Sequence, residues 1–106
     1  MRVVAIVPDL LDRSRVAAAL GDQVEFADDS SPCTGAGSPV DVVVVDLGRR
    51  SEAVASVRAA LPDVRIVAFA PHVDNAAMDA ARAAGADIVM PRSRFFRDVA
   101  AALTSA

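Results

Sequence analysis

The chain has 106 residues with a formal charge of −3, and 54% of its residues are apolar, among them 23 alanines and 17 valines. This length predicts a single domain spanning residues 1–106, and the high apolar fraction excludes a disordered chain. All 11 basic residues are arginine, which excludes lysine chemistry such as a Schiff base, and a mildly acidic chain without a basic run is not expected to bind nucleic acid.

Processing and compartment are also constrained by the sequence. Cys33 is the only cysteine, so no intramolecular disulfide can form, and a cytoplasmic location is predicted. The apolar start, Val3 to Val7, stops at Pro8 and Asp9. Because this run is too short for a signal peptide or a membrane span, we expect a buried first strand and no membrane association.

Short apolar runs predict five strands, at residues 3–7, 24–27, 42–45, 65–70 and 87–90. The run Val42 to Val45 has no polar alternation, which indicates a strand buried on both faces, as in a parallel sheet covered by helices. Apolar residues at helical spacing lie between these strands in every connection except one. The segment Asp28 to Pro39 has no apolar stripe, so the crossover helix there is expected to be missing or reduced to a turn.

Four helices are predicted from apolar residues at helical spacing and from capping residues. The first carries Val16, Ala19 and Leu20 and ends at Gly21, and the second carries Val54, Val57 and Leu61. The third runs from Asp74 to Ala84 with Gly85 at its end. The last carries Phe96, Val99, Ala100 and Leu103. Strands that alternate with helices in this order predict an α/β fold with a doubly wound parallel sheet.

Ligands of such sheets bind at the carboxyl ends of the strands. Asp9, Asp46 and Arg92 each follow a predicted strand and are expected to converge there. Asp9 and Asp46 are candidate ligands for Mg²⁺, which binds one or two carboxylates together with waters and phosphate. In the alternative, Asp9 and Asp46 cap local backbone N–H groups, and Arg92 is solvated or pairs with Asp46. A further alternative is a small ligand such as a nucleotide.

Two stretches carry a family resemblance. Asp41 to Leu47 is a valine strand ending in Asp46, and Ala81 to Asp87 is a helix end followed by Gly-Ala-Asp. Over nearly its whole length the chain resembles the receiver domain of two-component response regulators. The resemblance implies a flavodoxin-like sheet of order 2-1-3-4-5, Asp46 as the candidate phospho-acceptor, and a signalling role.

The sequence departs from the receiver pattern at positions that carry the switch. Pro8 replaces one residue of the acidic pair that binds Mg²⁺, and Ala70 replaces a hydroxyl residue. Val89 stands at the aromatic position and Arg92 at the lysine. The sequence therefore predicts a pseudo-receiver that acts through protein contacts with an impaired or absent phosphorylation switch, and needs either no cofactor or Mg²⁺. The alternative is a working phospho-acceptor that uses Asp46 with Mg²⁺.

An interaction surface is predicted at the start of the last helix. Phe95 is adjacent to Phe96 and so lies about 100° away from it around a continuous helix. With Arg92, Arg94 and Arg97 around it, an outward Phe95 would resemble an interface anchor. We therefore expect a protein partner or self-association through the fourth and fifth helices; the alternative is that Phe95 folds under a neighbouring helix.

Overall fold

The computed structural model describes residues 1–29 and 39–104 and contains one parallel sheet of order β2-β1-β3-β4-β5. Its strands are β1 (Val3–Ile6), β2 (Val24–Phe26), β3 (Val42–Asp46), β4 (Arg65–Ala70) and β5 (Ile88–Pro91). The helical elements are α1 (Leu10–Leu20), the 3₁₀ turn η1 (Gly21–Gln23), α2 (Leu47–Arg50), α3 (Ala53–Ala60), α4 (Asn75–Ala84), α5 (Arg92–Arg97) and α6 (Val99–Thr104). The predicted doubly wound α/β fold with order 2-1-3-4-5 is confirmed.

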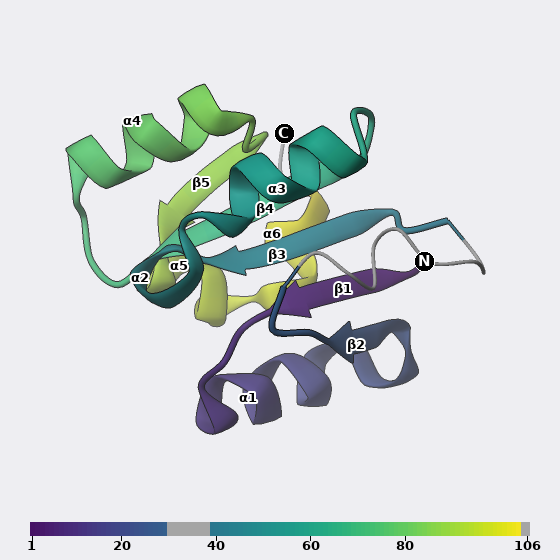
Figure 1. Ribbon diagram of the computed structural model, residues 1–106. Coiled ribbons are helices and arrows are strands. Elements are labelled where there is room, and N and C mark those ends of the chain that lie inside the picture. Colours follow the sequence, from purple (N-terminus) through teal and green to yellow (C-terminus); the bar gives the residue numbers. More distant parts are fainter. Residues whose placement is uncertain (30–38, 105–106) are drawn as a thin grey trace.

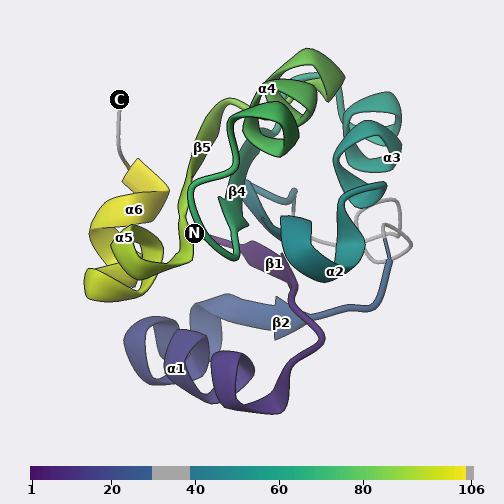
Figure 2. The same cartoon turned by 90° about the vertical axis from the view of Figure 1, so that its left-hand side faces the viewer.

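Helices cover both faces of the sheet (Figures 1 and 2). α2, α3 and α4 lie on one side, and α1, α5 and α6 lie on the other. The strands all point the same way, so their carboxyl ends meet at one edge, where α1 and α2 begin. Among the described residues, no helix is long and apolar enough to cross a membrane.

The central strand β3 separates two apolar cores. Val43 and Val45 pack with α3 and α4, whereas Val42 and Val44 pack with α1, α5 and α6. Because successive side chains of a strand point to opposite faces, an unbroken valine run fills both cores at once. The predicted burial of this strand on both faces is confirmed.

Helix ends follow the predicted capping chemistry. The carboxylate of Asp74 accepts a hydrogen bond from the backbone N–H of Ala77 at 3.1 Å, which starts α4. Gly85 ends the same helix with a φ of 120°, a backbone conformation that costs glycine least. The buried residues of α4 are Met78 and Ala81, which lie one helical turn apart.

The end of the chain differs from the single helix that its spacing predicted. Asp98 is extended, with φ −156° and ψ 93°, and separates α5 from α6. Its carboxylate accepts a hydrogen bond from the N–H of Ala101 at 3.1 Å and so caps the second piece. The predicted apolar stripe therefore changes: Ala102 is buried in α6, whereas Ala100 is exposed.

This break overturns the expectation that Phe95 points outward. Phe95 is fully buried, and its ring stacks on Phe69 with centroids 4.8 Å apart. Phe96, expected to face inward, is only partly buried and meets both rings edge-on, at 5.3 Å from Phe69 and 5.0 Å from Phe95. The outward orientation was wrong because it assumed one helix through Asp98, and the alternative, in which Phe95 packs inward, is confirmed.

The segment Asp28 to Pro39 was expected to lack a crossover helix. Residues 30–38 lie outside the described residues, so that expectation stays a prediction. β1 pairs with both β2 and β3 in parallel, so the connection returns the chain to the other side of β1.

Candidate functional site at the carboxyl edge of the sheet

Asp46 is the last residue of β3 and lies at the carboxyl edge, with only 4% of its surface exposed. Its Oδ1 accepts a hydrogen bond from the N–H of Gly48 at 2.9 Å and so caps α2. Burial raises the pKa of Asp46, and the bond from Gly48 partly opposes that shift. The expectation that Asp46 caps local backbone is confirmed, and its position at the strand end leaves the phospho-acceptor prediction standing.

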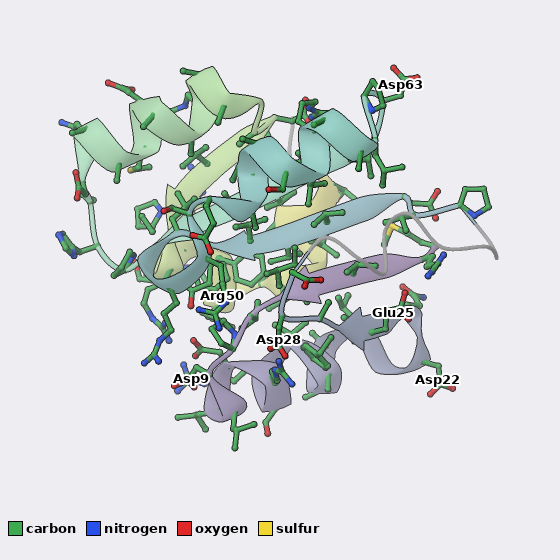
Figure 3. The ribbon with its side chains drawn as sticks, viewed as in Figure 1. Asp9, Asp22, Glu25, Asp28, Arg50 and Asp63 are labelled. Carbon is green, nitrogen blue, oxygen red and sulfur yellow. The ribbon has the colours of Figure 1, made fainter. Side chains whose placement is uncertain are left out.

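Asp9 lies at the start of α1, at the same end of the molecule as Arg50 (Figure 3). Its Oδ1 accepts the backbone N–H of Asp12 at 3.0 Å, and this hydrogen bond lowers the pKa of Asp9. Arg49 contributes a weaker contact, with Nη2 at 3.9 Å from Oδ2 of Asp9. The expectation that Asp9 caps the first helix is confirmed.

Arg92 does not pair with Asp46, and its partner is Asp12. Its Nη1 donates to Oδ2 of Asp12 at 2.9 Å, and Nη2 donates to Oδ1 at 2.7 Å. Asp12 is 2% exposed, which makes it the most deeply buried charged side chain among the described residues. This two-bond geometry is the strongest form of an arginine-carboxylate pair, so the predicted Arg92–Asp46 pair is wrong.

Sequence reasoning missed Asp12, although one signal was available. Asp12, Val16 and Leu20 are four residues apart and are the buried residues of α1. A carboxylate on the apolar stripe of a helix requires a buried partner, because an unpaired buried charge is very costly. The signal indicates that a partner exists, but it does not indicate which of the 11 arginines supplies it.

The guanidinium of Arg92 is fixed from a second side by an aromatic ring. It lies 5.0 Å from the ring centroid of Phe96, and Arg15 lies 5.6 Å from the same ring. The pKa of Arg92 is raised by its hydrogen bonds with Asp12 and also by the charges of Asp46 and Asp9. All three carboxylates are therefore close enough to Arg92 to interact with its charge.

Hydrogen bonds within the protein already occupy several of the carboxylate oxygens that a divalent ion would need. Both oxygens of Asp12 bind Arg92, and Oδ1 of Asp46 is bonded to Gly48. Within residues 1–29 and 39–104, no group of three or more acidic, histidine or cysteine side chains is placed to hold a metal ion. As arranged, the donor set does not fit a divalent ion, and the assignment of Mg²⁺ to Asp9 and Asp46 stays a prediction.

The remaining switch-equivalent positions are apolar. Ala70 is the last residue of β4 and is fully buried, so its methyl group offers no hydrogen bond at this edge. Val89 lies within β5 and is partly buried against the core that α3 and α4 cover. Neither side chain can bind a phosphoryl oxygen.

The residues of the predicted interface do not all lie on the surface. Arg94 and Arg97 are exposed and line a depression of about 200 Å³ together with Met90 and Ala102. Phe95 belongs to the core beneath them. The surface at the start of the last helix is thus basic rather than aromatic.

Solved structures of response regulators share this fold. One from Burkholderia pseudomallei, with a phosphorylated aspartic acid, a calcium ion and citrate, has a TM-score of 0.79 at 21% identity, over 96% of this chain and 65% of that chain. A response regulator from Thermotoga maritima has a TM-score of 0.75 at 18% identity, over 98% of both chains. One from Hahella chejuensis has a TM-score of 0.72 at 22% identity, over 97% of this chain and 86% of that chain.

No family model matches the sequence, and no curated protein does either. The likeness is therefore one of fold: the chain has the flavodoxin-like receiver fold of response regulators. The fold predicted from Asp41 to Leu47 and Ala81 to Asp87 is confirmed.

Proposed function

We propose that the chain is an atypical receiver-like signalling module that acts through protein contacts and lacks a full phosphorylation switch. The observation that carries this proposal is the pair between Arg92 and Asp12, at 2.7 and 2.9 Å. A receiver switch needs a cation that is free to bind the phosphoryl group on the acceptor aspartate. Here the guanidinium already has a buried partner.

Chemistry at the neighbouring positions supports the same conclusion. A phosphoryl group on Asp46 would replace the single charge of its carboxylate with the nearly two negative charges of an acyl phosphate, beside Asp12 and Asp9. Ala70 supplies no hydroxyl to bind it, and Arg92 would have to leave Asp12 buried without a partner. Phosphorylation would thus add negative charge at a point where Arg92 is already bound to Asp12.

The proposal is tested by incubating the protein with a small-molecule phosphodonor and Mg²⁺ and measuring its intact mass. We expect no phosphoryl adduct. A variant that carries Pro8→Asp, Ala70→Thr and Arg92→Lys together is the matched control for the assay. An adduct on the native chain that is lost in Asp46→Asn would overturn the proposal and support a working phospho-acceptor.

We also propose that the contact surface lies around Arg94 and Arg97. Neither guanidinium forms an ion pair among the described residues, and both line a depression together with the buried Met90 and with Asp98. Exposed arginines beside apolar side chains suit a protein partner or a second copy that presents acidic groups.

Sedimentation and pull-down of Arg94→Glu and Arg97→Glu variants test this surface. Each variant is expected to lose self-association or partner capture while remaining folded. Arg50→Glu reverses a charge on α2, on the other face of the sheet, and should leave association unchanged. Equal association in all three variants would exclude this surface.

A further inference from the structure

The helix α5 has two opposite sides, and its sequence decides which residues lie on each. Arg92, Phe95 and Phe96 stand at positions i, i+3 and i+4, so they share one side. Arg94 and Arg97 are three residues apart and lie on the other side, because each residue turns the helix by about 100°. Any contact that fixes the first side therefore fixes the direction in which Arg94 and Arg97 point.

Contacts with the rest of the protein must hold α5, because the helix is too short to set its own position. It has six residues, and its N-cap residue, Pro91, makes no side-chain hydrogen bond with it. An isolated helix of fewer than about 12 residues is marginal in water. At the other end, the extended Asp98 separates α5 from α6. The orientation of α5 therefore depends on what its first side contacts.

Two kinds of contact reach that side. Phe95 lies in the core and stacks on Phe69 at 4.8 Å. Arg92 donates to both carboxylate oxygens of Asp12, at 2.7 and 2.9 Å, and its guanidinium lies 5.0 Å from the ring centroid of Phe96. The aromatic packing holds the helix against the sheet. The two parallel hydrogen bonds add a direction, because a pair of this kind forms only in one relative orientation of its groups.

We infer that Asp12 is a positioning residue for the contact surface around Arg94 and Arg97: its carboxylate binds Arg92, sets the orientation of α5 and thereby preforms that surface. Asp12 belongs to α1 and is 2% exposed, so it does not itself touch a partner. The inference rests on the proposed function, since it concerns the surface named there. A surface held in this way is ready in the unmodified chain and needs no phosphoryl group to form.

Loss of the pair should change how often α5 has the orientation that a partner binds. Asp12→Asn removes the negative charge and offers Arg92 one acceptor oxygen in place of two. Because Arg92 is partly exposed, its guanidinium can then turn toward water. A partner binds only those chains in which α5 is correctly placed, so the apparent affinity falls with that fraction, by about tenfold in our expectation.

Amide hydrogen exchange of the isolated chain tests the inference without any partner. We expect the amides of α5 to exchange at least about tenfold faster in Asp12→Asn than in the native chain, because the helix opens more often. Val57→Ala is the matched control, since Val57 is fully buried in the core on the other face of the sheet. This control loses stability but keeps the pair, so its α5 amides should exchange at the native rate. Equal acceleration of α5 in both variants would overturn the inference.

Self-association, measured by sedimentation, then connects Asp12 with the surface. Asp12→Asn should associate about tenfold more weakly than the native chain, and Val57→Ala should associate as the native chain does. Arg92→Lys keeps the charge but has no fork to match a carboxylate, so its affinity should lie between those of the native chain and Asp12→Asn. Native affinity in Asp12→Asn overturns the inference, even where its α5 amides exchange faster.

Two further outcomes are also decisive. If Asp12→Asn does not fold, Arg92→Lys is used in its place: faster exchange of α5 with weaker association supports the inference, and native values of both contradict it. Native exchange of α5 in a folded Asp12→Asn overturns this inference alone. The proposed function is judged separately, by the phosphoryl mass of the native chain and by the association of Arg94→Glu and Arg97→Glu.

Discussion

Each edge of the sheet is organised around one arginine, and the two arginines bind different chemical groups. At the carboxyl edge, Arg92 binds the carboxylate of Asp12. At the opposite edge, Arg58 of α3 binds mostly backbone. Its Nη1 donates to the carbonyls of Pro62 at 2.7 Å and Val64 at 2.8 Å; further acceptors are the carbonyls of Leu61 and Gly85 and the carboxylate of Asp87.

This difference shows what each arginine does. The acceptors of Arg58 are mainly neutral carbonyls where α3 and α4 end, so Arg58 satisfies backbone groups that the helices leave unpaired. The acceptor of Arg92 is a single buried carboxylate, that of Asp12. Changes at Arg58 are therefore expected to alter stability, whereas changes at Arg92 are expected to alter both stability and the charge of the candidate site.

The largest effect is expected at the aromatic cluster beneath Arg92. Phe95→Ala removes a fully buried ring that stacks on Phe69 and supports Phe96, and should lower the free energy of unfolding by about 3–5 kcal/mol. Arg94→Ala, one residue away and exposed, should change it by no more than about 0.5 kcal/mol. Urea unfolding measures both. Equal effects would mean that Phe95 is not part of the core.

The strands could be predicted from the sequence, but the orientation of Phe95 could not. The strands were predictable, because a run such as Val42 to Val45 has one energetically favourable position in a covered parallel sheet. The orientation of Phe95 depends on a local competition at Asp98, where side-chain capping of the next helix wins over continuing the first. The spacing of apolar residues does not indicate whether the helix continues or breaks at Asp98.

At the site, local contacts were predictable and distant ones were not. The caps made by Asp9 and Asp46 involve residues two or three positions along the chain, so their residue types and positions were sufficient to predict them. The pair between Arg92 and Asp12 joins residues 80 positions apart. It depends on how α1 and α5 pack on the same face of the sheet, which the sequence leaves open among several arginines.

The next effect compares the two arginines directly. Arg58→Met should lower the free energy of unfolding by about 2–3 kcal/mol, because partly buried carbonyls lose a charged donor. Asp12→Asn should lower it by about 1–3 kcal/mol, since Arg92 keeps partial exposure and can regain water. Thermal and urea unfolding give the two values. If Asp12→Asn were neutral, the Arg92 pair would contribute nothing to stability.

Two glycines, one at each edge, give a smaller and more local test. An added Cβ at Gly85 would lie 2.8 Å from Cγ of Arg58, at a positive φ, and one at Gly48 would lie 2.6 Å from the ring of Pro71. Gly85→Ala should cost about 2 kcal/mol and Gly48→Ala about 1–2 kcal/mol.

The two glycine variants should differ in which edge they disturb. Amide chemical shifts are expected to change around Arg58 in Gly85→Ala and around Asp46 in Gly48→Ala, because Gly48 donates the N–H that caps Asp46. Gly21→Ala is the control for a positive φ in open space, since nothing lies within 4 Å of its added Cβ. If both variants changed the amide shifts of the same edge, Arg58 and Asp46 would not be the groups that the two glycines contact.

The smallest effect separates Asp46 from Asp9 within the carboxyl edge. Burial raises the pKa of Asp46 above 3.8, so the folded state binds this proton more tightly than the unfolded state does. Its contribution to stability is present below pH 3.8 and is lost as the pH rises through the raised value. The pKa of Asp9 is lowered by the N–H of Asp12, so its contribution is present above pH 3.8 and is lost as the pH falls through the lowered value.

Substituting the two residues should therefore change the pH profile in opposite directions. The free energy of unfolding of Asp46→Asn, relative to the native chain, should rise from acid toward neutral pH, whereas that of Asp9→Asn should fall over its own, more acidic interval. Asparagine retains the caps at both positions, so the comparison isolates the charge. Urea unfolding at a series of pH values measures the difference. If the free energy of unfolding of both variants ran parallel to that of the native chain at all pH values, neither carboxylate would bind its proton differently in the folded and unfolded states. The charge of Asp46 would then be as well solvated in the folded chain as in the unfolded one.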